Sequence, residues 1–81
     1  MTRPELIEMF TTTASEVAEK QFSGITEETI ISDLGVDSLA MLEVIGEMER
    51  ELGIAIPDDN LVGISTVSQL LDVVEKRLEA E

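Results

Sequence analysis

The chain has 81 residues, of which 18 are acidic and five basic, so its formal net charge is −13. It contains no cysteine and no histidine, which excludes disulfides, thiolate metal sites, a Ser-His-Asp triad and a cysteine nucleophile. The charge repels nucleic acid and anionic membranes, and it serves either to steer the chain toward basic partners or to keep it in solution. A carboxylate pair or a serine-lysine pair remains possible in principle, but a chain of this length has little room for a deep catalytic pocket. We therefore expect a single domain, residues 1–81, that is a cytoplasmic monomer with neither catalytic residues nor a metal site.

The first helix is predicted from about Arg3 to Glu19. Thr2 and Glu5 have the spacing of a capping box, in which each side chain bonds the other residue's backbone amide. Apolar residues follow at helical spacing: Leu6, Phe10, Ala14 and Val17. The three threonines at 11–13 have poor helix propensity, so packing of the apolar stripe must compensate.

Residues 20–36 are predicted to form a long connection. Residues 26–29 fit one helical turn within it. Five apolar residues require burial: Phe22, Ile25, Ile30, Ile31 and Leu34. We therefore expect a loop that these side chains hold across the core.

The second helix is predicted from Ser38 to about Leu52, with Asp37 as its N-cap and Gly53 at its end. Placing residues at steps of 100° groups five on the buried side: Met41, Val44, Ile45, Met48 and Leu52. The opposite side carries Leu39, Glu43, Gly46, Glu47 and Arg50.

Two further helices are predicted near the C-terminus. A short one runs from Asp58 to about Val62, and a longer one begins after Thr66, whose spacing to Gln69 fits a second capping box. The apolar stripe of the last helix is Val67, Leu70, Leu71, Val74 and Leu78. The prediction is an all-α fold, a small four-helix bundle with three longer helices, one short helix and a long first loop.

Ser38 is the most informative residue, because it begins a helix directly after a turn containing Gly35. The first amides of a helix lack intrahelical partners and lie at its positive pole. A phosphate on the Ser38 hydroxyl would be stabilised there by about 0.3–1 kcal/mol. Taken alone, Asp-Ser-Leu fits an ordinary first helical turn equally well.

The wider pattern resembles the acyl carrier proteins. It comprises Asp-Leu-Gly-Val-Asp-Ser-Leu at 33–39, Glu-Leu-Gly at 51–53, Ile-Pro-Asp at 56–58 and Ile-Ser-Thr-Val at 64–67. In that family the serine of the Asp-Ser-Leu motif receives 4′-phosphopantetheine through a phosphodiester. The resemblance therefore implies this role for Ser38, with Asp37 and Leu39 beside the cofactor. It also implies a phosphopantetheinyl transferase that uses coenzyme A, and acyl groups carried as thioesters in polyketide or fatty-acid-like biosynthesis.

The resemblance further implies that the second helix docks a ketosynthase, an acyltransferase and other synthase enzymes with basic docking surfaces. The implied docking residues are Leu39, Leu42, Glu43, Gly46 and Glu47. On the residues alone, Glu43 and Glu47 repel each other by a few tenths of a kcal/mol, which fits either a docking surface or a solvated acidic face. The mid-helix glycine costs about 0.5–1 kcal/mol, and either close approach of a partner or simple tolerance explains it.

Two differences from the best-known fatty-acid carriers argue against a simple assignment to fatty-acid synthesis. Ala40 stands where an acidic residue often follows Ser-Leu, and Arg50 interrupts the acidic face. Ser-Leu-Ala followed by Met-Leu-Glu, at 38–43, looks more like the discrete carriers of type II polyketide pathways. A peptidyl or aminoacyl carrier is an alternative that Val36-Asp37 disfavours. An unmodified acidic helical adaptor is another. The acidic residues at 58–59 are adjacent rather than spaced as in an EF-hand loop, so no dedicated calcium site is expected.

Overall fold

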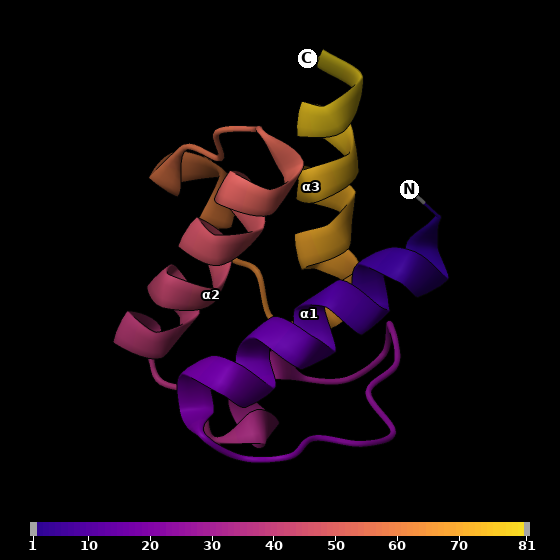
Figure 1. The fold of residues 1–81 in the computed structure, drawn as a ribbon. Helices are drawn as coiled ribbons and strands as arrows, with labels where there is room; N and C mark the ends of the chain where they lie inside the picture. Colours follow the sequence, from indigo (N-terminus) through magenta and orange to yellow (C-terminus); the bar gives the residue numbers. More distant parts are fainter. Residues whose placement is uncertain (1, 81) are drawn as a thin grey trace.

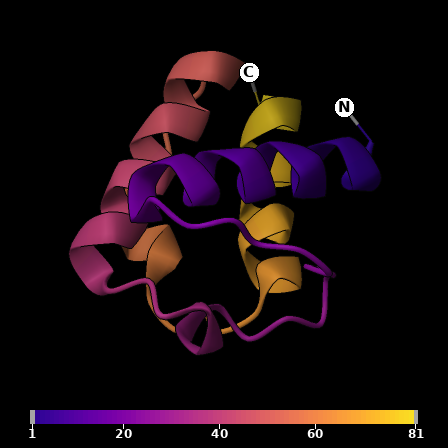
Figure 2. The same ribbon diagram turned by 60° about the horizontal axis from the view of Figure 1, so that its bottom comes forward.

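A computed structural model describes residues 2–80, except for the side chain of Asp58. The elements in chain order are α1 (Arg3–Ala18), η1 (Ile31–Leu34), α2 (Ser38–Leu52), η2 (Asp58–Leu61) and α3 (Val67–Ala80), where η denotes a 3₁₀ helix. Figures 1 and 2 show α1 lying across α2 and α3, with the long connection passing beneath them. In residues 2–80 the only strand-like pairing is the isolated bridge between Ile30 and Thr66, so the all-α prediction is confirmed.

Local signals determine where α1 begins and ends. The Thr2 amide donates to Glu5 Oε1 at 2.8 Å, and the Glu5 amide donates to Thr2 Oγ1 at 3.3 Å, which confirms the capping box. The helix ends at Ala18, one residue before the predicted end. Glu19 makes the last helical bond, from its amide to the Ser15 carbonyl, but takes a left-handed conformation with φ of 56°. The Lys20 amide then turns back to the same carbonyl at 3.1 Å, which ends the helix.

The predicted apolar stripes converge in one aliphatic core. Its fully buried side chains are Leu6, Phe10, Ala14, Val44, Met48, Val67, Leu70, Leu71 and Val74. Met41 and Leu52, toward the two ends of α2, are partly buried and pack against this core. A single core therefore joins all three α-helices.

The long connection differs from its prediction in two respects. Residues 26–29 close a turn, with the Thr29 amide on the Thr26 carbonyl at 3.2 Å, whereas the helical turn forms later, as η1. Ile30 was expected to be buried, yet it is 39% exposed, because its backbone pairs with Thr66 and the next residue turns inward. Ile31 is 6% exposed and enters the core in its place.

Backbone hydrogen bonds hold this connection against the start of α3. The Ile31 amide donates to the Ser65 carbonyl at 2.8 Å, and the Ser68 amide donates to the Glu27 carbonyl at 2.9 Å. Arg3 adds ion pairs to Glu27 at 2.6 Å and to Glu75 at 2.6 Å. Burial would lower the pKa of the Arg3 guanidinium, but its hydrogen bonds to these carboxylates outweigh burial and raise it. As a result, the connection and the start of η1 are fixed beside the start of α3.

The segment between α2 and α3 contains less helix than predicted. The short helix is a 3₁₀ turn that ends at Leu61, and Val62 has an extended backbone. The predicted capping box of α3 is present: the Gln69 amide donates to Thr66 Oγ1 at 3.2 Å, and the Thr66 amide donates to Gln69 Oε1 at 3.1 Å.

Candidate functional site

Ser38 is the first residue of α2, and the turn before it is built as the sequence predicts. Gly35 ends η1 in the left-handed region, with φ of 75°, where a side chain would be strained. Asp37 is extended and caps α2, because its Oδ1 accepts from the Ala40 amide at 2.8 Å and its carbonyl accepts from the Met41 amide at 2.9 Å. Ser38 itself is exposed.

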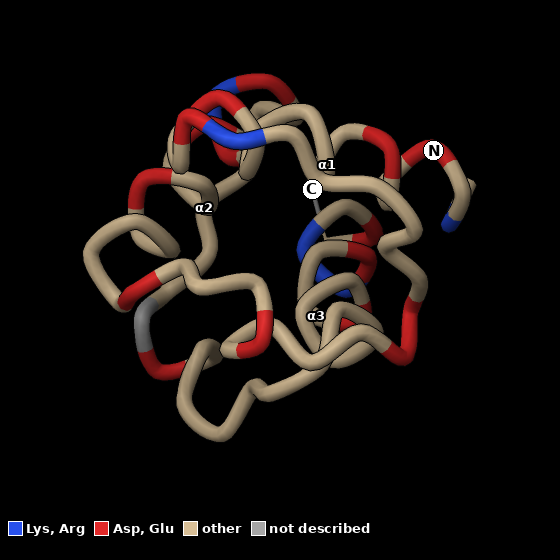
Figure 3. The backbone as a smooth tube through the Cα atoms, turned by 90° about the horizontal axis from the view of Figure 1, so that it is seen from below, with Lys and Arg blue, Asp and Glu red and all other residues tan. Residues whose placement is uncertain are grey.

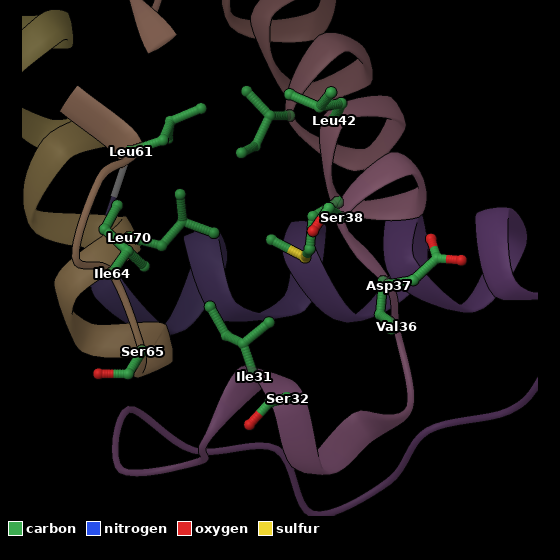
Figure 4. Close-up of a pocket in the computed structure, with 12 residues that line it drawn as sticks. Ile31, Ser32, Val36, Asp37, Ser38, Leu42, Leu61, Ile64, Ser65 and Leu70 are labelled. Atoms are coloured by element: carbon green, nitrogen blue, oxygen red, sulfur yellow. The ribbon is translucent and has the colours of Figure 1, made fainter. Parts of the chain in front are cut away.

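The start of α2 leaves two amides available to an anion. Asp37 occupies the third and fourth amides of the turn, and within residues 2–80 no hydrogen bond occupies the amides of Ser38 and Leu39. Figure 4 shows the Asp37 carboxylate turned away from the Ser38 hydroxyl. The positive pole of this 15-residue helix, with two unoccupied amides, therefore lies beside the Ser38 hydroxyl.

Ser38 also lies on the rim of a hollow of about 360 Å³ between α2, η1 and the segment from η2 to α3. We call this the apolar hollow. Its other lining residues are Ile31, Ser32, Val36, Asp37, Met41, Leu42, Ile45, Leu61, Ile64, Ser65 and Leu70. In Figure 4 the hydroxyls of Ser32 and Ser65 point away from the centre of the hollow. The space next to Ser38 is therefore walled mainly by aliphatic side chains.

The predicted docking residues lie along α2, beginning next to Ser38. Leu39 and Leu42 are 68% and 52% exposed, and Glu43 is exposed. Gly46 and Glu47 are half-buried, and Glu47 forms an ion pair with Arg50, so Arg50 partly neutralises this face. A Cβ at Gly46 would meet no heavy atom of the described chain within 4 Å. Packing within the described chain therefore does not require a glycine there.

The sequence analysis missed one exposed apolar residue near this site. Val62 is 81% exposed and directly follows Leu61, which lines the apolar hollow. It belongs to no helical stripe, and neither its neighbours nor its spacing marks it in the sequence. Leu61 and Ile64 were likewise not identified as walls of a hollow.

Figure 3 shows acidic residues on the helices and on the connections, with few basic residues among them. Among the described residues no group of three or more acidic side chains is arranged to hold a metal ion. None of the described helices combines the length and apolar character needed to cross a membrane.

Comparison with known proteins places these features in context. A family model described as "Phosphopantetheine attachment site" matches residues 10–74. An acyl carrier protein of Thermotoga maritima is 37% identical over 75 residues, which cover 88% of this chain and 93% of that protein. A meromycolate extension acyl carrier protein of Mycobacterium leprae is 35% identical over 82 residues, covering 100% of this chain and 70% of the relative.

Solved structures give the same picture. The crystal structure of an acyl carrier protein from Thermotoga maritima superposes with a TM-score of 0.88 at 33% identity, covering 96% of this chain and 92% of that one. The solution structure of the acetyl actinorhodin acyl carrier protein from Streptomyces coelicolor superposes with a TM-score of 0.73 at 32% identity, covering 100% and 95%.

Proposed function

The chain belongs to the acyl carrier protein family, and we propose that it carries its cofactor, 4′-phosphopantetheine, on Ser38 through a phosphodiester. The role of the family is to carry acyl groups in fatty-acid or polyketide synthesis. The observation that carries the proposal is the placement of Ser38, which is exposed, begins α2 and borders the apolar hollow. Ser68 is a serine in the first turn of α3, but it is half-buried and its hydroxyl accepts from Arg3 at 3.3 Å.

The residues around Ser38 fit an attached phosphate. When bound, 4′-phosphopantetheine supplies a thiol on a flexible arm, to which acyl groups are joined as thioesters. The amides of Ser38 and Leu39 would donate to the phosphate oxygens. Asp37 would keep the first turn open by capping it, with its carboxylate directed to the Ala40 amide. The protein's contribution is then to hold and present the arm, with no catalytic residue of its own.

The apolar hollow is the space in which an acyl chain carried on Ser38 would lie. Its aliphatic walls favour hydrocarbon, since each buried CH₂ is worth about 0.8 kcal/mol. Ser38 lies on its rim, so an arm attached there starts beside the entrance. We propose that short acyl chains are sheltered in this space between visits to enzymes.

Docking along α2 is the second part of the proposal. Leu39, Leu42 and Val62 offer exposed apolar contacts, while Glu43 and Glu47 offer charges to a basic surface. Gly46 lets a partner approach the helix backbone closely. The proposed partners are a phosphopantetheinyl transferase, a ketosynthase, an acyltransferase and other synthase enzymes.

The remaining features of the prediction rest on the sequence. Residues 1–81 are taken as one carrier domain, which the single core supports. A monomer in the cytoplasm that binds neither nucleic acid nor membranes stays a prediction.

Intact-protein mass spectrometry tests the attachment site. The apo protein is incubated with coenzyme A and a broad-specificity phosphopantetheinyl transferase, and we expect it to gain one phosphopantetheine group. Ser38→Ala removes the gain, whereas the matched variants Ser32→Ala and Ser65→Ala, at the other two serines that line the apolar hollow, retain it. A gain by Ser38→Ala, or none by the parent, contradicts the proposal.

A further inference from the structure

A second hollow, of about 350 Å³, lies between α1 and α2. We call it the acidic groove. It is lined by Glu5, Glu8, Met9, Thr12, Thr13, Glu16, Glu47 and Glu51. Its α2 residues lie on a different side of the helix from Met41 and Ile45, which line the apolar hollow. Five carboxylates therefore share one concavity to which, in the described part of the chain, no basic side chain contributes.

Thr13 shows that the acidic groove is more than a cluster of surface charges. It is the one buried polar residue between residues 2 and 80, at 7% exposure. The Thr11 hydroxyl donates a hydrogen bond to the Ile7 carbonyl at 2.8 Å, but the Thr13 hydroxyl makes no hydrogen bond to any described residue. No fully buried side-chain oxygen in this range lacks a partner, so the Thr13 hydroxyl must reach the open space of the groove. It is a recessed, unpartnered hydrogen-bonding group.

The carboxylates of the groove are only partly satisfied by the protein. Glu5 is engaged in the capping box of α1, and Glu47 is paired with Arg50. Within residues 2–80, Glu8, Glu16 and Glu51 have no ion pair. Glu47 and Glu51 are four residues apart on one helix, a spacing at which like charges destabilise it by a few tenths of a kcal/mol. A cation bound in the groove would relieve this repulsion.

We infer that the acidic groove binds a lysine side chain presented by a basic partner protein. An ammonium group has three donors and no acceptor, and the groove offers carboxylates together with the Thr12 and Thr13 hydroxyls. The methylene stem of lysine would pack on Met9, which is partly buried. The two threonines, which are poor residues for a helix interior, thereby acquire a role as hydrogen-bond acceptors.

The position of the groove suits a partner that also contacts the start of α2. Glu47 lies nine residues after Ser38, about 14 Å along the helix axis, and belongs to both the proposed docking face and the groove. The identity of the partner rests on the proposed function. The affinity of the groove for lysine does not, because none of its residues touches the cofactor site.

The test titrates the full chain carrying Ser38→Ala with a penta-lysine peptide at low salt, followed by NMR amide shifts. We expect shifts concentrated at Met9, Thr13 and Glu51. The double variant Glu8→Gln/Glu51→Gln should weaken binding by about threefold to tenfold. A charge-matched control, Glu28→Gln/Glu79→Gln, should bind like the parent.

Three results overturn the inference. They are shifts spread evenly over the acidic surface, equal losses in the two double variants, and the same shifts produced by Mg²⁺ or by a peptide of acetylated lysines. Thermal melts verify that both double variants are folded, and the groove variant should melt at or above the parent temperature because it loses repulsion. The titrated protein lacks Ser38, so a failure to bind lysine does not test cofactor attachment. Equally, a failure of cofactor attachment does not change the result of the lysine titration.

Discussion

The two hollows beside α2 have nearly equal volumes, about 360 and 350 Å³, but they are built from different parts of the protein. The apolar hollow is walled by members of the core, including Leu70 at 0% and Ile45 at 6% exposure. The acidic groove is walled by surface carboxylates, with Thr13 as its buried member. The walls of the first therefore contribute to folding stability, whereas the walls of the second carry charge that opposes it. The proposed acyl cargo would therefore contact aliphatic core side chains, whereas the proposed partner lysine would contact surface carboxylates.

The largest effect on stability is expected from Leu70→Ala, because Leu70 belongs both to the core and to the wall of the apolar hollow. Loss of this fully buried side chain should lower the free energy of unfolding by about 2–5 kcal/mol. Leu42 lines the same hollow but is 52% exposed, so Leu42→Ala should lower the free energy of unfolding far less. Urea titrations of both variants test this difference. Equal losses would contradict the expectation that the buried wall of the hollow stabilises the fold more than its exposed wall.

A smaller effect is expected at Gly46, which lies on α2 outside both hollows. An added Cβ meets nothing within 4 Å in the described chain, so Gly46→Ala should raise the free energy of unfolding by about 0.5–1 kcal/mol. The same methyl group should slow phosphopantetheine transfer to Ser38 by keeping the transferase away from the helix. Melting curves and transfer rates are the measurements. A stabilised variant that is modified at the parent rate would remove Gly46 from the docking surface.

The smallest effect concerns the pH dependence of Glu5, which lines the acidic groove. Hydrogen bonds from the Thr2 amide and hydroxyl lower the pKa of Glu5 below its ordinary value of 4.5. A carboxyl with a depressed folded-state pKa stabilises the fold above its unfolded pKa, and this contribution is lost as pH falls through the folded value. The parent should therefore exceed Glu5→Gln in stability at neutral pH, and the difference should shrink below about pH 4.5.

Thermal melts of the parent and Glu5→Gln across this range measure the difference, with Glu28→Gln as an exposed control. A difference that does not change with pH would mean that Glu5 acts without titrating.

The features that sequence analysis located correctly are those encoded within one helical turn. Asp37 and Gly53 mark both ends of α2, and two capping boxes mark the starts of α1 and α3. The exposure of Ser38 follows from the same local signals. The apolar stripes of the three α-helices identified every fully buried side chain of the core, whereas Ile54 and Ile56, at 7% and 5% exposure, join the core from the segment after α2.

The features that sequence analysis missed depend on contacts between distant segments. Ile30 is exposed because its backbone pairs with that of Thr66, and no local sequence pattern predicts this pairing. The apolar hollow joins η1, α2 and the segment before α3, so its walls are recognised only when these meet. The acidic groove likewise needs α1 and α2 together, although the unusual threonines at 11–13 were visible beforehand.

The attachment of 4′-phosphopantetheine to Ser38 is tested most directly by fragmentation mass spectrometry of the protein after reaction with coenzyme A and the transferase. We expect fragment ions that carry the added phosphopantetheine on residue 38 and on no other serine. Added mass on Ser32, Ser65 or Ser68, or its absence from the whole chain, would contradict it.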